Sequence, residues 1–156
     1  MAWFKSKGAV DAPTPVTPER LEAALSRQEI TADRADDGAP RFYCFINGFP
    51  VVFDASFDFS VVVSAATFER LSESREEEVL GWVKSVNADT HFVTTVQNRD
   101  ENGVFVAADG AIFTSQGLTD EQLDDQLELM LVGVLSTMSR FYEEFDITPE
   151  DPGNDN

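Results

Sequence analysis

The most regular hydrophobic pattern in this chain covers residues 118–146, near the C-terminus. Apolar side chains recur there at intervals of three and four residues, which places them on one face of an α-helix. Thr119 and Gln122 have the spacing of a capping box, in which each side chain satisfies a backbone N–H at the start of the helix. The pattern therefore predicts one long helix whose inner face carries the apolar residues at positions 123, 127, 131, 134, 138, 141 and 145.

The middle of this predicted helix has no polar face, because residues 129–135 read Leu-Met-Leu-Val-Gly-Val-Leu. A surface helix carries polar residues on its outer side, so we expect this segment to be covered on more than one side. One cover would be the protein's own sheet, and the other a second subunit or a bound protein. Leu129, Val132 and Leu135 are therefore candidate partner-binding residues.

Three antiparallel strands are predicted between residues 41 and 64. Residues 41–46 and 49–54 flank Asn47-Gly48, which favours a two-residue hairpin turn because both residues tolerate positive φ. Residues 57–64 alternate like a half-buried strand, with Phe57 and Phe59 on the apolar side.

The first of these strands is apolar on both faces. Phe42, Cys44 and Ile46 alternate with Tyr43 and Phe45, so the two sets point to opposite sides of the sheet. A solvent-facing side would carry polar residues, so we expect both sides to be at least partly covered. Tyr43 and Phe45 are the second set of candidate partner-binding residues. The alternative is that the protein's own helices cover both sets.

The remaining pattern predicts two more helices and two more strands. One helix begins at a Thr17 cap and fades near residue 30, and another begins at a capping box at Ser74 and ends near residue 86. Residues 91–97 and a run that begins at 104 are strands, with a bulge at Asp109-Gly110 or, alternatively, a second hairpin there.

The resulting order, α-β-β-β-α-β-β-α, predicts an α+β domain in which helices pack on an antiparallel five-stranded sheet. We place this domain at residues 17–147. Residues 1–16 and the acidic residues 148–156 are expected to be disordered tails.

The charge balance limits the classes of partner that the chain can bind, since 11 Lys+Arg against 29 Asp+Glu give a net charge of −18. Nucleic acid needs clustered cations and an anionic membrane would repel this chain, so we expect neither as a partner. A protein or peptide client fits, including a basic one that docks on Asp124, Asp125 and Glu128, although these acids most simply form the solvated face of the last helix. The single cysteine, and the lack of a signal-like or membrane-spanning run, indicate a cytoplasmic protein.

Few residues could support catalysis. His91 is the only histidine and no nucleophile motif accompanies it, so we interpret it as structural or surface-exposed. Cys44 reads as a small buried hydrophobe. Residues 98–109 partly match a calcium loop, with Asn98 first and Asp109 twelfth, but a hairpin turn is the ordinary explanation and calcium the alternative. We expect no metal ligands, no cofactor and no enzyme.

Three short motifs resemble the YbjN-domain family: Val-Asn-Ala-Asp at 86–89, Asp-Glu-Asn-Gly-Val at 100–104 and Gly-Leu-Thr-Asp-Glu-Gln-Leu at 117–123. Residues 17–25 resemble the family's first helix, so the resemblance covers residues 17–146. The family is often labelled as bacterial sensory transduction regulators. Its fold is similar to that of type III secretion chaperones, which are small acidic dimers that hold an unfolded client segment. The resemblance implies a chaperone-like or regulatory binding domain and brings no catalytic residues.

The leading hypothesis is a non-catalytic homodimer that binds a protein segment through an apolar surface with an acidic rim. The alternative is an enzymatic or small-molecule-binding domain with a pocket between sheet and helix.

Overall fold

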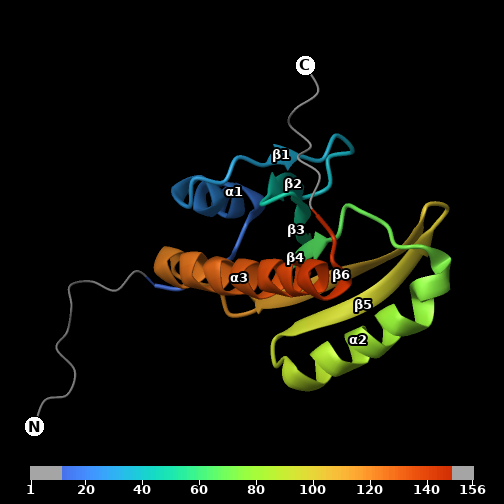
Figure 1. Ribbon diagram of the computed structural model, residues 1–156. Coiled ribbons are helices and arrows are strands. Elements are labelled where there is room, and N and C mark those ends of the chain that lie inside the picture. The colour runs from blue at the N-terminus through green and yellow to red at the C-terminus, as the bar shows by residue number, and fades with distance from the viewer. Residues whose placement is uncertain (1–11, 149–156) are drawn as a thin grey trace, which may run out of the picture.

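The structure is a computed structural model that describes residues 12–148 (Figure 1). Within this range it has three α-helices and six strands, which confirms the α+β class but corrects the strand count from five to six. The elements are α1 (Pro18–Arg27), β1 (Asp33–Arg34), β2 (Arg41–Ile46), β3 (Phe49–Phe57), β4 (Ser60–Ala66), a 3-10 turn (Glu73–Arg75), α2 (Glu76–Asp89), β5 (Val93–Asp100), β6 (Gly103–Phe113) and α3 (Asp120–Phe145).

The strands form one antiparallel sheet in the order β1-β2-β3-β4-β6-β5. The predicted hairpin between β2 and β3 is confirmed, because Ile46 pairs with Phe49 and the turn residues Asn47 and Gly48 have φ of 54° and 83°. The additional strand, β1, is two residues long and pairs with β2 at the edge of the sheet. Two residues cannot show a hydrophobic period, so the sequence pattern could not predict it.

The strand predicted over residues 57–64 exists, but its start is wrong, since it covers residues 60–66 as β4. β3 extends to Phe57, the chain turns at Asp58 and Phe59, and β4 begins at Ser60. The pairing of β3 with β4 also shifts between Asp54 and Phe57. Phe57, the last residue of β3, and Phe59, in the turn, are therefore both exposed. The alternating pattern from 57 to 64 spans a reversal of the chain and does not belong to one strand.

The predicted bulge at Asp109-Gly110 is also wrong, and so is the second hairpin. β6 is one continuous strand in which Gly110 pairs with Val63 on one side and Val93 on the other. A Cβ atom at Gly110 would lie 2.6 Å from the Met130 Sδ atom of α3. The glycine therefore allows the helix to approach the sheet closely and does not interrupt the strand.

The second helix begins and ends later than predicted. Ser72 caps the 3-10 turn, no side chain caps α2, and α2 continues to Asp89. Asn87 lies inside α2 and does not end it. Its Nδ2 donates to the Thr95 carbonyl at 2.8 Å, and the Thr95 N–H donates to its Oδ1 at 2.8 Å. The Asn87 amide thus satisfies backbone groups at the free edge of β5.

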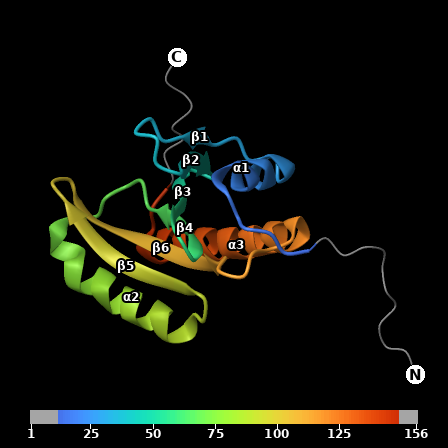
Figure 2. The ribbon, with the colours of Figure 1, turned by 180° about the vertical axis from the view of Figure 1, so that it is seen from behind.

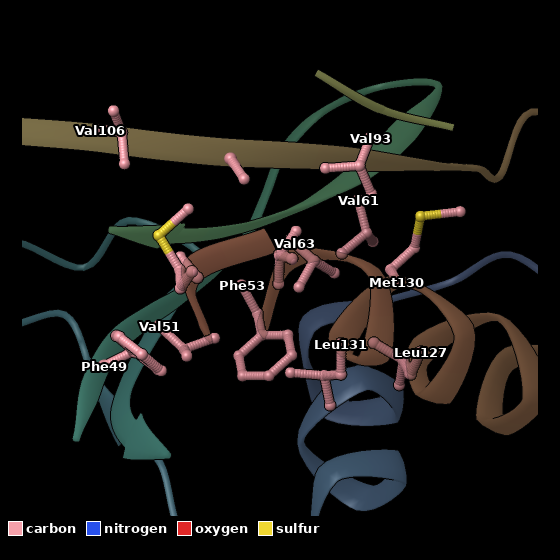
Figure 3. Close-up of a cluster of buried hydrophobic side chains, with 14 of the residues drawn as sticks. Phe49, Val51, Phe53, Val61, Val63, Val93, Val106, Leu127, Met130 and Leu131 are labelled. Atoms are coloured by element: carbon pink, nitrogen blue, oxygen red, sulfur yellow. The ribbon is translucent and has the colours of Figure 1, made fainter. Parts of the chain in front are cut away.

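The long helix α3 is the centre of the core. Its capping box is confirmed, with reciprocal hydrogen bonds between Thr119 and Gln122, and all seven predicted inner positions are buried. In both views α3 lies between α1 and α2 (Figures 1 and 2). On the α2 side, Trp82 packs edge-to-face on Phe141, with ring centroids 5.0 Å apart. The space between the sheet and α3 is filled by side chains that include Phe53, Val61, Val63, Leu127 and Leu131 (Figure 3).

The described part of the expected N-terminal tail, residues 12–16, contacts the domain. Thr14 and Leu118 exchange backbone hydrogen bonds of 3.2 and 3.0 Å. Arg20 donates to the carbonyl oxygens of Thr14, Pro15 and Leu118 and forms an ion pair with Asp120 at 2.6 Å. This arginine joins the start of α1 to the start of α3. Residues 1–11 and 149–156 of the expected tails lie outside the described residues.

Candidate functional site

The side of the sheet that faces away from α3 is open within residues 12–148. Phe42, Phe53 and Val63 point toward α3 and are completely buried. The intervening residues point the other way, and the strand pairing places them in rows across the sheet. We call this side the outer face; its residues are Arg41, Tyr43, Phe45, Pro50, Val52, Asp54, Val62, Ser64, Ala66, Thr94, Val96, Asn98, Phe105, Ala107, Asp109, Ala111 and Phe113.

The outer face is mostly apolar, with the charged residues Arg41 and Asp54 in the row of Val62, and it exposes large side chains at its margins. Phe113 is 72% exposed, Phe45 55%, Tyr43 39% and Val96 39%. Small residues occupy the middle of the face, where Ser64 pairs with Asp109 and Ala66 with Ala107. The result is a shallow, mostly apolar surface of a kind that usually marks a binding site.

One end of the outer face is hollowed. A cavity of about 460 Å³ opens there, and its walls include Val62, Phe92, Ala111 and Phe113. Asp109 lies in the same hollow, half-buried between Ser64 and Thr94 in the pairing of the strands. The Asp109 carboxylate has no hydrogen bond or ion pair with any other described residue. An unpaired carboxylate in an apolar surface is costly to cover unless a cation meets it.

The other end of the outer face is closed by Arg70. Its guanidinium lies 3.8 Å from the centroid of the Phe105 ring and donates to Asp100 at 2.7 Å. This hydrogen bond lowers the pKa of the Asp100 carboxyl below its usual value. Next to Arg70, the Phe68 ring packs edge-on against Phe45, with centroids 6.2 Å apart.

The five candidate partner-binding residues lie on two separate surfaces. Tyr43 and Phe45 are on the outer face, whereas Leu129 and Val132 lie on α3 and are 44% and 60% exposed. Leu135 is half-buried and packs against the core. The alternative that the protein's own helices cover all of these residues is therefore wrong for the described chain.

The sequence patterns missed Phe113 and Phe92 as parts of the candidate site. Phe113 is the last residue of β6, a strand that is apolar at almost every position, as β2 is. Phe92 directly precedes β5 and lines the hollow. A strand with two apolar faces could have flagged Phe113, but nothing local to Phe92 marks its place.

The acidic face predicted on the last helix is only partly solvated. Asp124 accepts two hydrogen bonds of 2.7 Å from Arg27 and thereby ties α1 to α3. The pair also raises the pKa of the Arg27 guanidinium. Asp125 and Glu128 are exposed as expected.

The candidate calcium loop is extended and cannot wrap an ion. Asp100 lies at the β5–β6 turn, and Asp109 lies on β6 six residues beyond Gly103, or about 20 Å at 3.3 Å per residue. Among residues 12–148, no three His, Cys, Asp or Glu side chains are grouped as a metal site. His91 is exposed at the edge of the hollow. The pocket expected by the alternative hypothesis would lie where core side chains fill the space between sheet and α3 (Figure 3).

Cys44 is half-buried, and burial raises the pKa of its thiol from 9.0 to about 11. The thiolate is the reactive form, so at pH 8 we expect iodoacetamide to alkylate the native protein about a hundredfold more slowly than the urea-unfolded chain. Mass spectrometry of timed samples measures both rates. Native and unfolded rates within threefold of each other would contradict this prediction.

The fold and the open face define a small α+β domain with an exposed, mostly apolar sheet surface. The family model of YbjN, described as a putative bacterial sensory transduction regulator, matches residues 17–146. The chain belongs to the YbjN family, as its three motifs predicted.

One similar solved structure is the crystal structure of YbjN from E. coli, described as a putative transcription regulator. The two chains superpose with a TM-score of 0.71 at 14% sequence identity, over 86% of this chain and 97% of that chain. This likeness shows a shared fold. No curated protein matches the sequence. None of the described helices has the length and hydrophobicity needed to cross a membrane.

Proposed function

We propose that this YbjN-family domain is a non-catalytic, chaperone-like regulatory domain of the cytoplasm that binds a protein segment on its outer face. The observation that carries the proposal is an open, apolar sheet face with Phe113, Phe45 and Tyr43 exposed at its margins. Aromatic side chains of this kind contribute much of the binding energy in protein interfaces. The family's description as a regulator agrees with binding, since regulation of this kind needs a partner.

The charges around the outer face are mixed. Asp33, which pairs with Tyr43 at the β1 edge, has an exposed carboxylate, whereas Arg41 lies on β2 and Arg70 at the closed end of the face. The chain as a whole carries a net charge of −18, which would attract a basic partner and accelerate its association.

The second exposed surface, on α3, fits the homodimer in this proposal. Leu129 and Val132 lie one helical turn apart with their side chains in solvent. The sheet separates them from the outer face, so two subunits joined through α3 would each keep a free outer face. This arrangement would present two partner sites per dimer.

Affinity capture of the tagged protein from its own cells, read by mass spectrometry, tests the binding function. We expect a recurrent partner that is lost from the Tyr43→Ser, Phe45→Ser double variant and retained by the matched control Phe57→Ser, Phe59→Ser. Those control residues are at least as exposed on average but lie where β3 ends and the chain turns into β4. Circular dichroism must first show that both variants fold. A partner that both variants retain would contradict the assignment to the outer face.

Light scattering after size exclusion tests the dimer. We expect twice the 17.3 kDa chain mass for the wild type and a single chain mass for Val132→Glu, because a carboxylate buried in an apolar interface is strongly unfavourable. A wild-type monomer at 100 µM would remove the dimer from the proposal and leave the outer face untouched.

A further inference from the structure

We propose that the partner segment binds as an amphipathic α-helix, laid along the outer face, and that a lysine or arginine within its apolar side pairs with Asp109. This inference rests on the proposed function and specifies the chemistry of the partner.

Each sheet edge interrupts the row of backbone groups that an added strand would need. At the β5 edge, the side chain of Asn87 occupies both the N–H and the C=O of Thr95. At the opposite edge, β1 is only two residues long. A client that binds by extending the sheet needs a row of free backbone groups. The partner is therefore expected to lie across the face and to satisfy its own backbone, as a helix does.

The dimensions of the outer face suit a helix. From β2 to β6 there are three strand spacings, or about 14 Å, against a diameter of about 10–12 Å for a helix with its side chains. The small residues Ser64 and Ala66 on β4 and Ala107 on β6 leave room for helix side chains. Tyr43 and Phe45 would flank the helix on β2.

Asp109 requires that a partner covering this surface supply a positive charge. The carboxylate lies in the mostly apolar hollow, whose lining also includes His91 and Thr94, and it has no partner among the described residues. A fully apolar helix would strip its water without replacing it, whereas a cation at that position would compensate the charge. A second copy of the chain is a poor occupant, because two copies joined through this face would bring two unpaired Asp109 carboxylates onto the same covered surface.

Two synthetic 18-residue helical peptides test this inference on the full chain. They share a Leu/Ala apolar side and differ at one central apolar-side position, Lys in one and Glu in the other. We expect the Lys peptide to bind, and Asp109→Asn to weaken its binding at least tenfold, as for the loss of a charged hydrogen bond. Asp109→Lys should reverse the preference in favour of the Glu peptide.

The control variant is Asp125→Asn, which removes an exposed carboxylate of α3 on the far side of the sheet and should leave binding unchanged. Three results would overturn the inference: no binding of the Lys peptide, equal binding to wild type and Asp109→Asn, or equal binding of a proline-interrupted peptide that cannot form a helix. A cellular partner that depends on Tyr43 and Phe45 but not on Asp109 would preserve the proposed function and reject this inference alone.

Discussion

Replacing Phe53 with alanine is expected to lower the free energy of unfolding by about 4 kcal/mol. Phe53 is completely buried and lies between β3 and α3 in the middle of the core (Figure 3). Its removal would leave a cavity between the sheet and α3 that neighbouring side chains can fill only in part. Urea denaturation followed by circular dichroism measures the change through the midpoint, provided that the slope stays constant.

Phe113→Ala is the matched control, because it deletes the same side chain from the opposite side of the sheet. Phe113 is 72% exposed, so we expect the free energy of unfolding to change by no more than about 0.5 kcal/mol. Binding of the cellular partner should nevertheless weaken in this variant, since Phe113 borders the hollow of the outer face. A cost for Phe113→Ala comparable to that for Phe53→Ala would mean that the outer face is covered within the folded protein.

These contrasting roles of two phenylalanines show what the sequence could and could not predict. The elements that local signals specify were predicted well. The caps at Thr17 and Thr119 and the turn at Asn47-Gly48 depend on side chains within a few residues of the backbone groups they satisfy. Seven inner positions of α3 followed from helical spacing alone.

Features that depend on distant contacts were not predictable from local patterns. In the sequence, Gly110 indicates an interruption of a strand. In the structure, a glycine is needed there because Met130, twenty residues later, packs against it. Asn87 reads as the end of a helix, and its role is to bond the neighbouring strand. Burial in this sheet also depends on β4 pairing with β6 and not with the next strand in the chain.

The candidate site also has features that the sequence predicts and features that only the structure shows. The excess of apolar residues on β2 and α3 was visible, because each element has more such residues than one buried face requires. That the two surfaces lie on opposite sides of the sheet was not visible, and neither was the isolation of Asp109. Those facts require the register of four strands, which brings Tyr43, Val52, Ser64 and Asp109 into one row.

Gly103→Ala is expected to destabilise the protein by about 3 kcal/mol, through backbone strain and a steric clash. Gly103 has a φ of 133°, and a Cβ atom there would overlap the carbonyl oxygen of Leu71. Leu71 and Val104 exchange backbone hydrogen bonds of 2.8 and 2.9 Å, which hold Arg70 at the closed end of the outer face. The substitution should therefore displace this end of the site as well.

Gly81→Ala is the matched control for Gly103→Ala and should have the opposite sign. Gly81 lies within α2, and apart from its own neighbours in the helix no described atom lies within 4 Å of the position its Cβ would take. Alanine in an exposed helix interior is favoured over glycine by about 1 kcal/mol, so this variant should be more stable than the wild type. Thermal melts of both variants measure whether the melting temperature falls for Gly103→Ala and rises for Gly81→Ala. A neutral Gly103→Ala would mean that the Leu71–Val104 contact can relax, and that Arg70 is not held over Phe105 by this glycine.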